Sequence, residues 1–192
     1  MSNKTHFGDR LVTPSLTKTV APKRQEGPVM VNSAPREIRC VPQGICSWNY
    51  WLIAEGSAAN PEKFSLFHHH FSGGYITQGN IQLDIHQRGI LQGRWELCHG
   101  ETELITATSD SLFSRSMTLE DDRHQWELVP GSTFSNSYRL QRDGVVYATF
   151  AAEHAFTRRA RIVTTQPDVD LVLLAFSFWL IAKRWRNQSQ SG

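Results

Sequence analysis

Three arginines stand close together in the segment TRRARI: Arg158, Arg159 and Arg161. A guanidinium group holds a phosphate or a carboxylate through two parallel hydrogen bonds, so neighbouring arginines are typical of an anion site. If the segment is a β-strand, Arg159 and Arg161 lie on one face, because alternate strand residues point the same way. We interpret the segment as the best candidate for an anion-binding site, with an outward-facing polar strand as the alternative.

A second basic cluster, Lys183, Arg184 and Arg186, follows the most apolar stretch of the chain. Each basic residue near an anionic lipid surface contributes about 1 kcal/mol to membrane association, so several together give weak binding. The two clusters form one patch only if the end of the apolar stretch emerges on the same side as the arginine segment. On opposite faces, neither cluster is sufficient alone.

Histidines offer a possible metal site. The segment FHHHF would place His68 and His70 on one face of a strand and His69 on the other, with His86 in a neighbouring strand. Two or three imidazoles can bind zinc, but no carboxylate or cysteine stands beside them at a ligand spacing. We therefore expect structural or solvent-facing histidines, and no metal or other cofactor.

The common catalytic signatures GxSxG, HExxH, GxxxxGK[ST] and GxGxxG are absent from the sequence. We therefore expect a binding protein and no enzyme activity, the competing hypothesis being an enzyme that uses the histidine strand. The net charge of +2 is too mild to indicate a nucleic-acid-binding protein.

The cysteines and the N-terminal segment bear on the cellular compartment. Cys40, Cys46 and Cys98 form no CxxC spacing, which is typical of buried thiols in a reducing compartment. The N-terminal segment has no apolar run of the kind that a secretory signal needs. Residues 1–34 are rich in Pro, Thr, Ser and Lys, which predicts a disordered basic tail. We expect a cytoplasmic protein, with peripheral membrane association left open.

Short segments with period-two alternation, separated by turn residues, run from about Arg36 to Val163 and predict antiparallel strands. Asp143 and Gly144 between two such segments are a strong hairpin signal. About ten to twelve strands at this spacing favour a sandwich or a barrel. The clearest segments are SWNYWLIAE, KFSLFHHHF, NIQLDIHQ, GRWELCH, ELITATS, LFSRSMTLE, HQWELV, SYRLQRDG, VVYATFAAE and RRARIVTT.

The segment from Leu171 to Ala182 is apolar except for Ser177, so as a helix it would be apolar on every side. Such a helix spans roughly 18 Å, whereas the hydrocarbon core of a bilayer is about 30 Å thick. Acidic residues before the segment and basic residues after it complement the helix dipole. The pattern favours a buried core helix over residues 168–186, with a C-terminal membrane anchor as the alternative.

An antiparallel β domain followed by one all-round apolar helix resembles the tubby-like C-terminal superfamily, which includes tubby, the phospholipid scramblases and the LURP-one-related proteins. The similar segments, from Ile38 to Trp185, are GGYITQGNIQLDIHQRGILQGRWEL, ATSDSLFSRSMTLE and DGVVYATFAAEHAFTRRARI running into PDVDLVLLAFSFWLIAKRW. The resemblance implies about twelve strands closed into a barrel with the helix through its centre. The interior of a barrel of that size must hold water, a ligand or another element, and an apolar helix would fill it.

The family's functional residues do not carry over. Tubby proteins bind phosphoinositides through basic side chains on the barrel surface, but no matching lysine pair aligns, and Lys63 is the only lysine of the barrel region. The calcium-binding segment and the palmitoylated cysteine cluster of scramblases have no counterpart. LEDDRHQ, residues 119–125, is interpreted as a turn between strands.

The sequence thus predicts three parts: a tail (1–34), a closed antiparallel barrel around a core helix (35–187), and a C-terminal tail (188–192). The expected function is non-enzymatic binding, with peripheral association with anionic phospholipid or phosphoinositide. The alternatives are a protein-interaction scaffold without a ligand and a tail-anchored membrane protein. The residues expected to bind an anion or lipid are Arg158, Arg159, Arg161, Lys183, Arg184 and Arg186.

Overall fold

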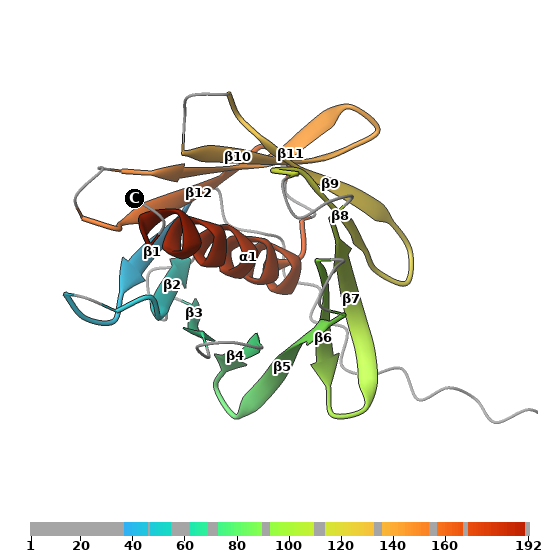
Figure 1. Cartoon of the computed structure of the whole chain (residues 1–192), viewed down its shortest axis with the longest axis horizontal. Helices are drawn as coiled ribbons and strands as arrows, with labels where there is room; N and C mark the ends of the chain where they lie inside the picture. The colour runs from blue at the N-terminus through green and yellow to red at the C-terminus, as the bar shows by residue number, and fades with distance from the viewer. Residues whose placement is uncertain are drawn as a thin grey trace, which may run out of the picture.

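The computed structural model describes residues 37–45, 47–54, 62–68, 73–89, 93–109, 114–132, 136–153, 157–166 and 169–190, with the side chains of residues 62 and 68 excepted. The expected tail over residues 1–34 lies outside this range. The described part is a closed barrel of twelve antiparallel strands with a C-terminal helix inside the ring, as Figure 1 shows. The mainly β fold class predicted from the sequence is confirmed.

Each strand is hydrogen-bonded to the next one in the chain, and the first closes the ring against the last. The strands β1 and β4 are not among the clearest alternating segments of the sequence. In chain order the strands are β1 (Glu37–Pro42), β2 (Tyr50–Ala54), β3 (Glu62–His68), β4 (Gly73–Gln78), β5 (Ile81–Arg88), β6 (Arg94–His99), β7 (Thr102–Thr108), β8 (Met117–Glu120), β9 (Gln125–Pro130), β10 (Ser137–Arg142), β11 (Val145–Ala152) and β12 (Ala160–Thr164).

The strands alternate between the barrel interior and its outer surface, and this alternation explains the sequence pattern. In β12, Ala160 and Ile162 are buried, whereas Arg161 and Val163 are exposed. The predicted hairpin between β10 and β11 is confirmed: Asp143 and Gly144 have φ angles of 52° and 76°, the left-handed values that a two-residue hairpin turn requires.

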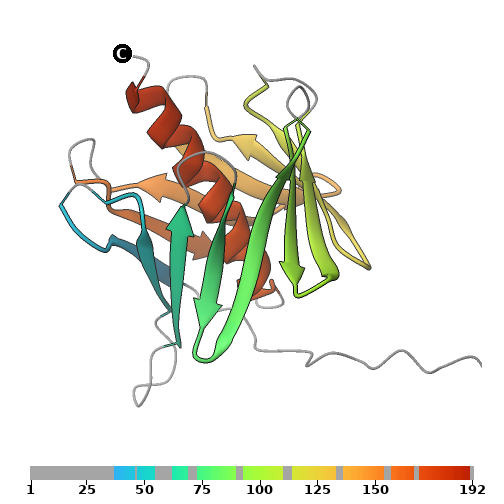
Figure 2. The ribbon, with the colours of Figure 1, turned by 60° about the horizontal axis from the view of Figure 1, so that its bottom comes forward.

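The helix α1 (Leu171–Gln190) lies within the barrel in both views (Figures 1 and 2). Every residue from Leu173 to Ala182 is buried, so the strands surround the helix on all sides. Twelve strands enclose more space than their own side chains fill, and the apolar helix completes the core. The buried core helix predicted from the sequence is confirmed. No helix of the described chain is long and apolar enough to cross a bilayer.

The helix boundaries differ from the predicted 168–186. Asp170 caps the helix, because its Oδ1 accepts a hydrogen bond from the backbone N–H of Val172 (2.7 Å), and the first helical residue is Leu171. At the other end the helix continues to Gln190, into the predicted tail 188–192. Residues 187–190 are polar and include no glycine or proline, either of which would favour the end of a helix.

Gly74 in β4 lies beside Trp179 of the helix. The indole Nε1 of Trp179 donates a hydrogen bond to the carbonyl oxygen of Phe67 (2.9 Å). A Cβ atom at position 74 would overlap this carbonyl oxygen and would lie 2.8 Å from Trp179 Nε1. The hydrogen bond between helix and wall therefore requires glycine here.

We expect Gly74→Ala to lower the free energy of unfolding by about 1–3 kcal/mol, the usual cost of overpacking a core, as measured by denaturant unfolding. Gly93→Ala is the matched control, because a Cβ there would have its nearest neighbour at 3.5 Å. Equal stability of the two variants would contradict this account of Gly74.

Candidate functional site

The two ends of the barrel differ in how the strands are joined. At the end that we call the turn end, β2 connects to β3, and short turns join other strands at residues 79–80, 100–101, 121–124 and 143–144. At the opposite end, the loop end, β1 connects to β2, β3 to β4, β5 to β6, β7 to β8, β9 to β10 and β11 to β12. Figure 2 shows α1 running from the turn end to the loop end, where the C-terminus emerges.

The contacts of α1 place the C-terminal basic cluster at the loop end. Arg184 Nη1 donates a hydrogen bond to the carbonyl oxygen of Ser114 (2.8 Å), between β7 and β8. Lys183 Nζ lies 4.6 Å from the ring centroid of Trp95, near the start of β6. Burial lowers the pKa of Lys183, and the charge of Arg186 lowers it further. Lys183, Arg184 and Arg186 are all partly exposed there.

The arginine segment also begins at the loop end, but not as the predicted strand. The strand β12 starts only at Ala160, so Arg158 and Arg159 belong to the preceding connection. Arg158 has a φ of 53°, which departs from the extended backbone of a strand. The carbonyl oxygen of Arg159 accepts a hydrogen bond from the N–H of Glu153 (2.8 Å), so Arg159 is held beside the end of β11.

Arg161 lies on the barrel wall, inside β12, and its side chain is exposed. It stands directly opposite Arg39 of β1 in the strand register. The predicted residues thus divide between two places: Arg158, Arg159 and the helix cluster at the loop end, and Arg161 on the outer wall.

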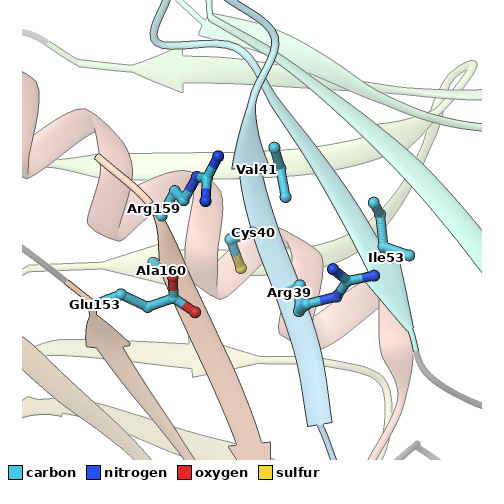
Figure 3. A pocket seen from close by; sticks show the side chains of 7 residues that line it. All are labelled: Arg39, Cys40, Val41, Ile53, Glu153, Arg159 and Ala160. Carbon is cyan, nitrogen blue, oxygen red and sulfur yellow. The ribbon is translucent and has the colours of Figure 1, made fainter. Parts of the chain in front are cut away.

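A surface hollow of about 400 Å³ lies next to Arg159, on the outside of the barrel between β1 and β12. Figure 3 shows Arg159 and Glu153 on one side of it, and Arg39 and Ile53 on the other. Two guanidinium groups favour an anion in the hollow, whereas the Glu153 carboxylate opposes one. Arg39 was not predicted from the sequence. It stands between the apolar residues Ile38 and Cys40, and this alternation indicates a strand residue that faces outward.

Several buried polar atoms at the loop end have no hydrogen-bond partner. They are the hydroxyl oxygens of Tyr50 and Tyr138, Nη1 of Arg158 and Nε1 of Trp185. A buried polar group without a partner destabilises a folded protein, and each such group requires an explanation. The loop end therefore holds several buried polar atoms that could bind a ligand, although Gln78 Oε1 at the turn end and Ser177 Oγ within α1 also have no hydrogen-bond partner.

The charges of the barrel differ from end to end. The loop end carries Arg158, Arg159, Lys183, Arg184 and Arg186. Two further arginines there are paired with carboxylates, because Glu96 accepts hydrogen bonds from Arg88 Nε (2.9 Å) and Arg94 Nε (3.1 Å), and Glu103 lies 3.6 Å from Arg94. The turn end is acidic on balance, with Glu101, Glu120, Asp121, Asp122 and Asp143 in or beside its turns against Arg123 and Arg142. An anionic surface would therefore attract the loop end and repel the turn end.

The histidines and cysteines add no site within the described residues. His86 is exposed on β5, whereas the side chain of His68 and the whole of His69 and His70 lie outside the described part. No group of three or more potential metal-ligating side chains is found among the residues described. Cys40 and Cys98 are buried free thiols, as predicted, and burial raises the pKa of Cys40 well above its usual range.

Comparisons of the chain with models of protein families, with curated proteins and with solved structures give no match.

Proposed function

We propose that this protein is a non-enzymatic binding module whose loop end associates with the anionic surface of a phospholipid membrane. The observation that carries the proposal is the common location of the two basic clusters. Arg158 and Arg159 precede β12, and Lys183, Arg184 and Arg186 end the buried part of α1, at the same end of the barrel. This arrangement lets their contributions add, at about 1 kcal/mol for each basic residue near the surface.

An exposed apolar side chain strengthens the proposal. Ile45, in the connection between β1 and β2, is 99% exposed and is the most exposed large apolar residue described. It belongs to the loop end, as do the basic clusters. An apolar side chain beside basic residues is the combination that peripheral membrane proteins use, because one inserts between headgroups while the others attract anionic lipid.

The tubby-like resemblance supports the same kind of partner, since the barrel around an apolar helix has the architecture which that resemblance implies. The cytoplasmic leaflet is the membrane surface rich in anionic lipid. We therefore place the proposed association at that leaflet, with the axis of α1 pointing toward the membrane.

The proposal is tested by co-sedimentation of the protein with vesicles of phosphatidylcholine alone and with vesicles that also contain phosphatidylserine. We expect binding only to the vesicles with phosphatidylserine, and less binding at high salt, because salt screens exposed charges. Binding that depends neither on lipid charge nor on salt concentration would refute the proposal. No binding to either vesicle, with capture of another protein instead, would favour the alternative of a protein-interaction scaffold.

Ile45→Ser should weaken binding to the same vesicles by about tenfold or more, since burying an isoleucine side chain contributes roughly 1.5–3 kcal/mol. Val145→Ser is the matched control, because Val145 is 48% exposed but lies at the turn end. The affinity of the Val145 variant should equal that of the original protein. If the two variants weaken binding equally, Ile45 has no special contact with the membrane.

A further inference from the structure

Arg158 combines two unfavourable features in one residue. Its φ of 53° lies in the left-handed region, which residues other than glycine, asparagine and aspartate rarely adopt. Its Nη1 is buried and has no hydrogen-bond partner. A strained backbone and a buried polar atom without a partner persist where the surrounding structure enforces them, which is typical of functional positions.

The surroundings of Arg158 hold the guanidinium group in place without neutralising it. Its Cζ lies 4.5 Å from the ring centroid of Trp48, a distance typical of cation–π contact. The described carboxylates that form ion pairs do so with other residues. An aromatic face supplies no hydrogen-bond acceptor in the ring plane, so the buried Nη1 of this half-buried arginine still lacks one.

Tyr50, the first residue of β2, adds a second unused donor close to Arg158. The side chain of Tyr50 is fully buried, its hydroxyl has no hydrogen-bond partner, and its ring packs edge-on against Phe178 of α1 (5.1 Å between centroids). In the strand register, Pro42 of β1 pairs with Tyr50, and Cys40 of β1 pairs with Ala160. Arg158 lies two residues before Ala160, just as Pro42 lies two residues after Cys40. The register therefore brings Tyr50 and Arg158 to either side of the end of β1.

The electrostatics agree with this placement. Burial raises the pKa of Tyr50 to about 12, and the positive charge of Arg158 acts in the opposite direction. The phenol is therefore protonated at neutral pH and is available as a donor. A guanidinium N–H and a phenol O–H that both lack an acceptor are complementary to one oxyanion.

We propose that Arg158 and Tyr50 bind a single phosphate group at the mouth of the barrel, beside the C-terminal half of α1. A water molecule could accept the same two hydrogen bonds but would leave the guanidinium charge uncompensated, whereas phosphate satisfies both needs. This inference deepens the proposed function, since the phosphate of one lipid headgroup would fit the site. Free phosphate has the same chemistry, and the test separates the two sources.

The first arm of the test is calorimetric titration of the protein with inorganic phosphate, compared with chloride at equal ionic strength. We expect saturable binding of phosphate alone, weakened about tenfold or more by Tyr50→Phe, because a hydrogen bond to a charged group is lost. Tyr50→Phe removes no hydrogen bond from the free protein, so its melting temperature should not fall. Arg158→Asn should abolish binding while keeping the left-handed backbone, which asparagine tolerates.

Arg161→Gln is the matched control, because it removes one exposed positive charge from the barrel wall and should leave phosphate affinity unchanged. Equal affinity of the Tyr50→Phe variant and the original protein would overturn the site. So would the absence of any phosphate binding that chloride does not reproduce.

The second arm uses vesicles containing phosphatidic acid, which present the same phosphate chemistry on a membrane. Vesicle binding that falls with Tyr50→Phe, together with phosphate binding, identifies the lipid headgroup as the source. Phosphate binding without vesicle binding supports the site, with free phosphate as the source, and refutes the membrane function. Vesicle binding that Tyr50→Phe does not change, with no phosphate binding, overturns the site and leaves the membrane function standing.

Discussion

Truncation of the chain before Leu171 is expected to abolish folding. The removed segment includes Phe176, Phe178 and Trp179, all fully buried within the barrel. Burying one large apolar side chain contributes roughly 1.5–3 kcal/mol, and the helix buries enough of them to exceed the about 5–15 kcal/mol of net stability of a typical domain. The remaining strands would enclose an empty apolar space that neither water nor their own side chains can fill favourably.

Circular dichroism and thermal unfolding test this expectation. The truncated chain should show no cooperative melt, or should be insoluble. The matched control is truncation after Arg186, which removes only the exposed end of α1, residues 187–190, and the last two residues. The melting temperature of that control should be close to the melting temperature of the full chain. A soluble, cooperatively melting chain without the helix would show that α1 does not form the core.

The helix was predictable from the sequence because an apolar segment bracketed by charges has few physical solutions. A run from Leu171 to Ala182 that is apolar on all sides must be enclosed, and it is too short to span a bilayer. The strands were predictable wherever inward apolar residues alternate with outward polar ones. The strand β4 begins with Gly73 and Gly74, which have no side chain to show an alternation. A Cβ at position 73 would overlap the carbonyl oxygen of Ile85, and a Cβ at position 74 would meet Phe67 and Trp179.

The basic residues of the candidate site were predictable, but their arrangement was not. Arg158 lies two residues before β12, on the side of Ala160 and Ile162 if the strand alternation continued, yet its backbone is left-handed and its side chain contacts Trp48. That contact joins residues far apart in the chain, so only the closed barrel reveals it. Tyr50 resembles any apolar strand residue in the sequence, and its unsatisfied hydroxyl becomes evident only once the helix fills the barrel.

Neutralising the loop end should reduce membrane binding more than any other change of surface charge. In the triple variant Arg159→Gln, Arg184→Gln, Arg186→Gln, three positive charges are removed from the end that would face the lipid. At about 1 kcal/mol each, their loss predicts about a hundredfold weaker binding to anionic vesicles at low salt. Glutamine at position 184 keeps an amide that can still donate to the Ser114 carbonyl.

A charge-matched control separates the position of the charges from their number. Lys63, Arg123 and Arg139 are exposed on the barrel wall or at the turn end, so changing all three to glutamine removes the same net charge elsewhere. The acidic turns at Asp121 and Asp143 lie on the side that should face away from the membrane. The control triple variant should therefore lose little affinity. Melting temperatures of both triple variants establish that each is folded before binding is compared.

The most direct test of the account is the comparison of these two triple variants in co-sedimentation with vesicles containing phosphatidylserine at low salt. We predict that the loop-end variant no longer sediments at a lipid concentration that still sediments both the control variant and the original protein. Equal loss of binding in the two triple variants would show that net charge alone governs association. Unchanged binding of the loop-end variant would contradict the claim that this end of the barrel meets the membrane.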